Sequence, residues 1–315
     1  MKTENKVKPE KLSFDKFRSA FRDRYECAFP ELTKNYTLSE QLIKKNNREL
    51  HGLVVRGRNT RVAPVFYYED FYEAYKKGTS IDDCIGKIIQ FMNTNKMPDE
   101  DFGDFLSSWK RVKDHLIVKL ICRKTNHNML KETPFRVFGD MAVIAQIYVD
   151  NEALGKGAVT VDLPLVSHWN ISVSELFDTA LENMLKYHVR FINLMDCARA
   201  EDEERSKEEE VPKIYVTTFD ESFCGAASML RTDELISFAK KQDKDFYVLP
   251  VSVHEVLLIE KLDEVDPNLI KSMLESINSD HAANDEILSE QIFVLDRNDK
   301  YLRSGEDGKT VCIVG

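Results

Sequence analysis

The sequence lacks several features by which whole classes of protein are recognised. Its six cysteines are scattered, and none stands in a CxxC or CxxH pair. Disulfide frameworks and zinc sites need closer or more regular spacing than this. We therefore expect the cysteines to be reduced and mostly buried.

Long apolar runs are also missing. The longest are the size of a strand, such as VLLI at 256–259, and a membrane span needs about 20 apolar residues. The first residues, MKTENKVKPEKLSF, are charged and have no apolar core of the kind found in signal peptides. These two absences predict a cytoplasmic protein with no membrane partner.

The charge balance is acidic, with a formal net charge of −10. Nucleic acids and anionic membranes are bound by positive surfaces, so this balance disfavours both as partners while leaving room for a local basic patch. Apolar residues make up 43% of the chain and charged residues 31%, which is typical of a globular protein and not of a disordered one.

The motifs of cofactor and metal enzymes are absent as well. There is no GxxxxGK[ST] phosphate loop, no GxGxxG after a predicted strand and no GxSxG turn. His115 and His127 are the two histidines nearest to each other in the sequence, and they lack the spacing of an HxxxH or HExxH metal site. The sequence therefore predicts neither a cofactor nor a metal site.

The residues that are present predict an α+β fold. A helix is expected from Ser13, which can cap it, with Phe14, Phe17, Ala20 and Phe21 as its apolar stripe. Further elements follow from apolar periodicity and turn residues. They are strands at 36–45, 49–57 and 61–68, helices at 69–78 and 79–97, a helical start at 107–115 running into a strand at 116–122, strands at 134–149 and 157–167, and a helix at 171–185 with Ser172 and Glu175 as a capping box.

An acidic stretch, EDEERSKEEE at 201–210, resists packing and predicts an exposed linker. Beyond it we expect a strand at 213–219 with GAASML (225–230) as its partner, a helix at 232–242, strands at 245–252 and 254–261, a helix capped by Asp266, and a strand and turn at 290–304.

The predicted organisation is a loose N-terminus (1–12), an N-terminal α+β region (13–200), the linker (201–210) and a C-terminal α+β unit (211–315). Antiparallel and mixed sheets with flanking helices would form two packed subdomains. Nothing in the sequence indicates an oligomeric state.

Several segments resemble a bacterial family of unknown function. They are LHGLVVRGRNTRVAPVFYYEDFYEAYKKG (50–78), residues 112–149, residues 225–261 and LSEQIFVLDR (288–297). The most specific part is the signature Leu-Pro-x-Ser-x-His-Glu-Val at 249–256. The resemblance implies an uncharacterised bacterial cytosolic protein and brings no activity, cofactor or catalytic residue with it. A second uncharacterised bacterial family is more distantly similar to the last third of the chain.

Polar residues around this signature supply two catalytic hypotheses. Cys224, His254 and Glu255 are the residue types of a cysteine hydrolase, although neighbouring strand residues point to opposite faces and the related sequences carry no thiol at position 224. Ser252 and His254 lie two apart, hence on one face of a strand, and form the second candidate pair. The structural interpretation of the same residues is that the hydroxyl and the imidazole close local hydrogen bonds beside Pro250. It predicts that His254→Ala lowers thermal stability.

Two further segments are candidates for binding. Arg56, Arg58 and Arg61 cluster at a predicted hairpin tip and could bind a phosphate or an acidic partner. The aromatic run 66–75 predicts core packing, with a protein-binding patch at Tyr68 and Tyr72 as the alternative.

These patterns predict a non-enzymatic binding or accessory protein with another protein as its partner. The surface that binds the partner would be built by residues 50–75 and 246–260, and it would include His254. The alternative is a hydrolase-like enzyme centred on His254, with Cys224 or Ser252 as its nucleophile.

Overall fold

The computed structural model describes residues 11–57, 63–94, 101–151, 155–194, 212–219, 224–262, 265–280 and 286–314. The chain divides into two compact units: unit 1 holds residues up to 44, 49–106 and 151–155, and unit 2 holds residues 45–48, 107–150 and 156–315. Helices and antiparallel sheets occur in both, which confirms the predicted α+β class. Among the described residues, the helices are too short or too polar to cross a membrane.

Unit 1 packs helices on one face of a three-stranded sheet of order β1-β2-β3. Its elements are α1 (Phe14–Ala28), α2 (Pro30–Asn35), β1 (Tyr36–Lys45), β2 (Arg48–Gly57), β3 (Val65–Tyr67), α3 (Tyr68–Lys76), α4 (Ile81–Thr94) and the first part of α5 (Asp101–Ser107).

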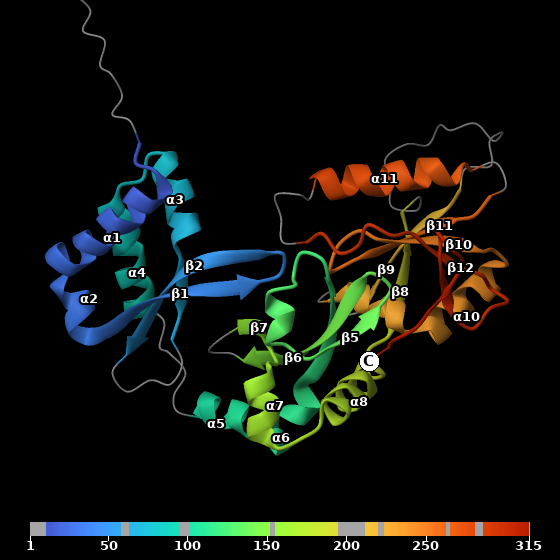
Figure 1. The fold of residues 1–315 in the computed structure, drawn as a ribbon, viewed down its shortest axis with the longest axis horizontal. Helices are drawn as coiled ribbons and strands as arrows, with labels where there is room; N and C mark the ends of the chain where they lie inside the picture. Colours follow the sequence, from blue (N-terminus) through green and yellow to red (C-terminus); the bar gives the residue numbers. More distant parts are fainter. Residues whose placement is uncertain are drawn as a thin grey trace, which may run out of the picture. The chain divides into compact units, whose positions relative to one another are not determined.

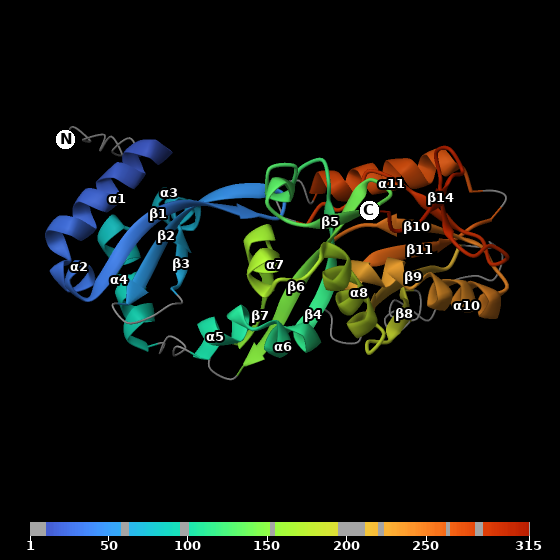
Figure 2. The same cartoon turned by 60° about the horizontal axis from the view of Figure 1, so that its bottom comes forward.

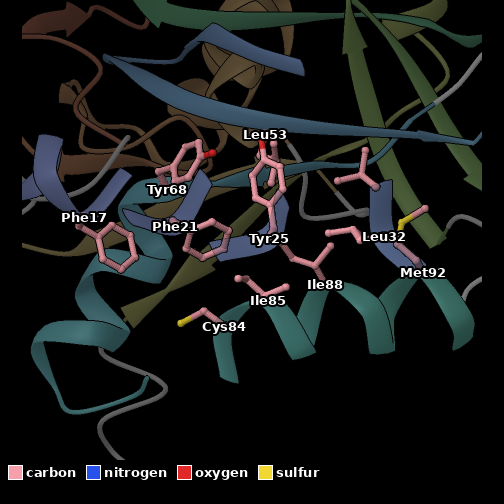
Figure 3. Close-up of a cluster of buried hydrophobic side chains, with 11 residues drawn as sticks. Phe17, Phe21, Tyr25, Leu32, Leu53, Tyr68, Cys84, Ile85, Ile88 and Met92 are labelled. Carbon is pink, nitrogen blue, oxygen red and sulfur yellow. The ribbon is translucent and has the colours of Figure 1, made fainter. Parts of the chain in front are cut away.

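The core of unit 1 follows from helical spacing. Phe17, Phe21 and Tyr25 repeat every four residues on α1, so they fall on one face and are all buried. Figure 3 shows them beside Ile85 and Ile88 of α4, with Leu53 of β2 and Tyr68 of α3 completing the cluster. The predicted strands at 36–45 and 49–57 and the two predicted helices are found, whereas the third strand is shorter than predicted and covers only Val65–Tyr67, because α3 already begins at Tyr68.

Unit 2 contains two sheets. The elements of the first are β4 (Leu116–Cys122), β5 (Phe135–Phe138), β6 (Met141–Asn151) and β7 (Gly155–Thr160), in the order β4-β6-β5 with β7 also on β6. Helices α6 (Trp109–Val112), α7 (Leu163–Trp169) and α8 (Val173–Met184) and the short 3-10 turns η1 (Lys113–His115) and η2 (Met129–Lys131) accompany it.

The second sheet has seven strands among the described residues, in the order β14-β13-β12-β10-β11-β9-β8, and each neighbouring pair is antiparallel. Figure 2 shows β10, β11, β9 and β8 side by side. Its elements are β8 (Val189–Asn193), β9 (Ile214–Phe219), η3 (Gly225–Leu230), α10 (Thr232–Gln242), β10 (Phe246–Pro250), β11 (Val256–Glu260), α11 (Pro267–Asp280), β12 (Phe293–Leu295), β13 (Leu302–Ser304) and β14 (Thr310–Val311).

Alternation along β10 assigns one helix to each face of this sheet. Tyr247 packs with Ile270 and Leu274 of α11, whereas the neighbouring Phe246 ring lies 5.6 Å from Phe238 of α10. Figure 1 shows α11 and α10 on opposite sides of this sheet. Successive side chains of a strand point to opposite faces, so both faces of β10 are covered and all five of its residues are buried.

The sequence predicts a capping residue at the start of three helices, namely Ser13, Ser172 and Asp266. Ser172 caps α8 by accepting a hydrogen bond from the Glu175 N–H at 3.1 Å, which is one of the two bonds of the predicted capping box. Asp266 accepts from the Asn268 N–H at 2.9 Å, so the predicted cap of α11 is also confirmed. Ser13 precedes α1 as predicted, but its side chain makes no capping hydrogen bond.

Two predicted strands are helical instead. GAASML forms η3, a 3-10 helix with an i→i+3 bond from the Ala227 N–H to the Cys224 carbonyl at 2.9 Å. The end of the predicted strand 157–167 is helix α7, because Asp162 accepts a capping bond from the Leu165 N–H at 2.9 Å and Pro164 occupies its first turn.

The predicted linker at 201–210 lies outside the described residues. The strands before and after it, β8 and β9, pair with each other in the seven-stranded sheet.

Candidate functional site

The signature residues form the connection between β10 and β11. Pro250 pairs with Val256, so residues 251–255 make a five-residue turn. The Ser252 side chain is buried and its hydroxyl accepts hydrogen bonds from the N–H groups of His254 and Glu255, both at 3.1 Å. The Ser252 N–H donates to the Glu255 carbonyl at 3.2 Å. The serine therefore holds the backbone of its own turn, as short polar side chains in turns commonly do.

The two remaining polar residues of the turn face outward. The side chains of His254 and Glu255 are exposed. Among the described residues, no hydrogen bond joins the His254 imidazole to Ser252, Cys224 or Glu255. The structural interpretation of the sequence expected local hydrogen bonds from both the Ser252 hydroxyl and the His254 imidazole. The hydroxyl makes such bonds, whereas the described structure gives the imidazole none within the turn.

Segment η3 packs against this turn. The Ala226 N–H donates to the Val253 carbonyl at 3.3 Å, and the Thr218 hydroxyl donates to the His254 carbonyl at 3.1 Å. Gly225 lies between these two bonds, in a space that only a residue without a Cβ can occupy. Because η3 contacts β4 of one sheet and β9 and β11 of the other, it forms the junction between the two sheets of unit 2.

Cys224 begins this segment in a left-handed conformation, with φ of 49°. Its side chain is only 5% exposed, and its Sγ lies 3.7 Å from Oε1 of Gln146 on β6. Burial raises the pKa of the Cys224 thiol. A nucleophilic cysteine needs the thiolate form, which a lowered pKa favours, so the environment of Cys224 is that of a structural thiol.

The arginine cluster is described in part. Arg56 is exposed near the end of β2, and Arg58 and Arg61 lie outside the described residues. An exposed arginine at this position is compatible with the predicted binding of an acidic group.

The two tyrosines proposed as a binding patch are engaged within unit 1. Tyr68 is fully buried in the core and its hydroxyl donates to Glu40 at 3.0 Å. Tyr72 is half-buried, and its hydroxyl donates to the Leu12 carbonyl at 2.9 Å. Tyr68 thus lies in the core instead of at a surface, whereas Tyr72 is partly accessible.

Glu40 is the centre of a polar cluster that sequence reasoning missed. It accepts hydrogen bonds from Arg18 at 3.0 Å, from Arg22 at 2.6 and 2.8 Å and from Tyr68. Burial acts to raise the pKa of Glu40, but the hydrogen bonds from Arg22, Tyr68 and Arg18 outweigh burial and the pKa lies below its usual value. Burial and the charge of Glu40 raise the pKa of the Tyr68 hydroxyl. The i, i+4 spacing of the two arginines on α1 was the signal that could have indicated a shared acidic partner.

A second missed pair is His51 and Glu69. The Glu69 carboxylate lies 2.8 Å from Nδ1 of His51 and also accepts from the His51 N–H at 3.0 Å. Both side chains are half-exposed, and the His51 ring stands edge-on to Phe14 at 5.4 Å. Because they lie on β2 and at the start of α3, 18 residues apart, no local spacing marks them as partners.

The described part of the chain contains no group of three His, Cys, Asp or Glu side chains that could hold a metal ion. The mutual geometry of the candidate residues thus supports turn formation at Ser252, packing at Gly225 and ion pairing at Glu40.

Comparison with known proteins adds the family and little more. A model of the family of unknown function DUF5688 matches residues 14–297, which is most of the chain, so the protein belongs to this family. No curated protein matches the chain. No solved structure matches it either.

Proposed function

We propose that the protein is a non-enzymatic binding or accessory protein, acting in a bacterial cytosol with another protein as its partner. The observation that carries the proposal is the use of the Ser252 hydroxyl. It accepts two backbone hydrogen bonds and is buried, so the signature stabilises a turn. A serine nucleophile would instead present its oxygen to a base and to the substrate.

The environment of Cys224 supports the same proposal. A buried thiol with a raised pKa has neither the access nor the ionised sulfur that thiol chemistry needs. The hydrolase alternative would require Cys224 or Ser252 to leave its present contacts and to meet the exposed His254 ring.

Chemical labelling of the folded protein tests this proposal. We expect iodoacetamide to modify the exposed Cys27 and Cys312, and to leave Cys224 and the buried Cys84 and Cys122 unmodified until the protein is unfolded. A fluorophosphonate probe should leave Ser252 unlabelled. Peptide mass spectrometry reads both results.

Stoichiometric labelling of Ser252 or Cys224 in the folded protein, lost in His254→Ala, would overturn the proposal and establish the hydrolase alternative. Cys27 and Cys312 serve as internal positive controls for the thiol reagent, because their exposure makes them reactive under the same conditions.

The partner surface that we propose centres on Arg56, Arg58 and Arg61. A guanidinium group pairs with carboxylates through two parallel hydrogen bonds, so three of them suit an acidic segment of a partner protein. The chain as a whole is acidic, and a local basic cluster on it would therefore select where such a segment binds.

Retention on an immobilised polyglutamate peptide tests the partner surface. We expect the full chain to be retained at physiological salt and the triple variant Arg56→Ala, Arg58→Ala, Arg61→Ala to be lost to the flow-through. A matched control is Lys240→Ala with Lys241→Ala, two exposed cations on α10. Equal retention of the triple variant, or no retention of the unmodified chain, would show that this surface is not the acidic-partner site.

A further inference from the structure

One edge of the first sheet of unit 2 is occupied by the C-terminal segment 312–314. β5 pairs with β6 along one of its edges, and on its other edge the described residues form one backbone bridge, between Val137 and Val314. The Val137 N–H donates to the Val314 carbonyl at 2.7 Å, and the Val314 N–H donates to the Val137 carbonyl at 2.9 Å. This outer edge of β5 therefore holds an extended segment by backbone hydrogen bonds.

The contacts that hold the C-terminal segment are few. The segment follows β14 directly, so it leaves the seven-stranded sheet and reaches β5 of the other sheet within three residues. Cys312 is exposed, and Val314 is 61% exposed. Ile313 is half-buried and borders an apolar cavity together with Leu181 and Met184 of α8. Contacts of this kind, with little buried surface, are among the first to open in a folded protein.

The outer edge of β5 has room for a longer segment. Alternate residues of a strand direct their N–H and carbonyl groups to the same edge, so those of Phe135 point the same way as those of Val137. Phe135 is 37% exposed, and the described residues form no second bridge beside it. With Val137 opposite Val314 in an antiparallel pair, Phe135 lies opposite the second position after Val314. A longer extended segment would therefore form two bridges where residues 312–314 form one.

We propose that the outer edge of β5 binds an extended segment of the partner protein, and that residues 312–314 occupy this edge as an internal competitor. An open strand edge recognises a peptide by adding it as a further strand: backbone hydrogen bonds supply affinity, and alternate side chains supply specificity. The partner segment would carry an aliphatic residue at the position of Ile313, beside the apolar side chains of α8, and would continue at least two residues beyond the position of Val314. The inference rests on the proposed function for the protein nature of the partner, and it uses a different surface from the arginine cluster.

Two synthetic peptides test the edge. The first is Ser-Ile-Val-Gly, the sequence of residues 312–315 with serine in place of cysteine, and the second extends it by Thr-Val-Thr. Both carry a dye on an N-terminal Gly-Ser-Gly spacer, and fluorescence anisotropy measures their binding to the full chain and to a variant that lacks residues 312–315. We expect the second peptide to bind the truncated variant about tenfold more tightly than the first, because a second bridge adds a pair of backbone hydrogen bonds. The full chain should bind both more weakly, because its own segment competes for the edge.

An N-methyl group on the valine that stands for Val314 in the second peptide gives the matched control. It removes the N–H that would donate to the Val137 carbonyl and changes no side chain. We expect this peptide not to bind the truncated variant.

A disulfide tests displacement in the full chain. The variant is Val137→Cys with Val314→Cys, in a background of Cys27→Ser and Cys312→Ser. The Cα atoms of a hydrogen-bonded antiparallel pair lie about 5.5 Å apart, which suits a disulfide. The oxidised protein should not bind the second peptide, and the reduced protein should bind it as the full chain does. This pair keeps the test available if the truncated variant does not fold.

Three results would overturn the proposal. They are no binding of the second peptide to the folded truncated variant, unchanged binding of the N-methyl peptide, or equal binding by the oxidised and reduced proteins. Dimerisation of the truncated variant that an excess of the second peptide does not reverse would assign the edge to a second copy of the chain and would also contradict it.

The arginine surface is tested separately by the same peptide. The triple variant Arg56→Ala, Arg58→Ala, Arg61→Ala should bind the second peptide as the unmodified chain does. Retention on polyglutamate without peptide binding would overturn this inference alone, and peptide binding without retention would overturn the arginine surface alone.

Discussion

The carbonyl oxygen of His254 lies 2.1 Å from the position that a Cβ of Gly225 would occupy. The hydroxyl oxygen of Thr218 lies 2.0 Å from the same position, and it donates to that carbonyl. Both distances are far shorter than any contact that a real Cβ makes. The signature turn and η3 therefore pack backbone against backbone, and this close approach links the β10–β11 connection to the junction between the two sheets of unit 2.

Gly225→Ala should destabilise unit 2. The added methyl group would push against the His254 carbonyl, which belongs to the backbone and cannot rotate away, so we expect a loss of about 2–3 kcal/mol in the free energy of unfolding. Urea denaturation followed by circular dichroism measures it. Gly86→Ala is the matched control: a Cβ at Gly86, inside α4, meets nothing within 4 Å, and the change should stabilise by about 0.5–1 kcal/mol. A Gly225 variant as stable as the unmodified chain would contradict the close packing.

Ser252→Ala should also destabilise the protein, by about 1–2 kcal/mol, because the N–H groups of His254 and Glu255 would lose their acceptor. His254→Ala should change the free energy of unfolding by less than about 0.5 kcal/mol, because its side chain is exposed and the described structure gives it no hydrogen bond to the turn. This expectation replaces the one drawn from the sequence, in which the imidazole helped to hold the turn. Melting temperatures of the two variants compare them directly, and a larger loss for His254→Ala would reverse the assignment.

Elements with strong local signals were predictable from the sequence. The strand Leu116–Cys122 has the predicted bounds, because a run of apolar residues follows a polar helical turn there. The helix from Val173 begins where the capping residues place it. Local chemistry decides these boundaries, and local chemistry is what a single sequence contains.

The segment GAASML shows where local signals stop. Its small apolar residues suit a strand, but the Gly225 position needs contact with Thr218 and with the turn at 252–255, and that turn is distant in the sequence. The contacts of the candidate site could not be predicted from local sequence for the same reason. The partners of the Ser252 hydroxyl depend on how the chain folds around it. Arg18 and Arg22 share Glu40 only because α1 packs beside β1. Tertiary contacts override propensity at such positions.

Glu40→Gln should remove a pH-dependent part of the stability of unit 1. The pKa of Glu40 is lowered in the folded protein, so its contribution is present above the unfolded pKa, about 4.3, and is lost as pH falls through the folded pKa. At neutral pH we expect the variant to be about 1–2 kcal/mol less stable, because the amide keeps hydrogen bonds with the arginines and loses their charge. The difference from the unmodified chain should shrink below about pH 4. Urea denaturation at several pH values measures it, and a difference that stays constant down to acid pH would contradict the role of the charge.

Asp140→Asn should reveal the opposite pH dependence. Asp140 lies in the turn between β5 and β6, where it accepts hydrogen bonds from the Ser289 hydroxyl at 2.7 Å and from the Glu290 N–H at 3.0 Å. Burial raises its pKa in spite of these two bonds. A raised folded pKa means that the contribution of Asp140 is fully present below its unfolded pKa, about 3.9, and is lost as pH rises through the folded pKa.

The stability of the unmodified chain relative to Asp140→Asn should therefore increase as pH is lowered from 7 toward 4, because the asparagine does not titrate. Ser289→Ala offers a second measurement. Removing the Ser289 bond, which lowers the pKa of Asp140, should move this change in stability to higher pH. Paired urea titrations of the three proteins give the curves. A relative stability that decreases on acidification would show that the hydrogen bonds of Asp140 outweigh its burial, and the Asp140 carboxylate would then behave as Glu40 does.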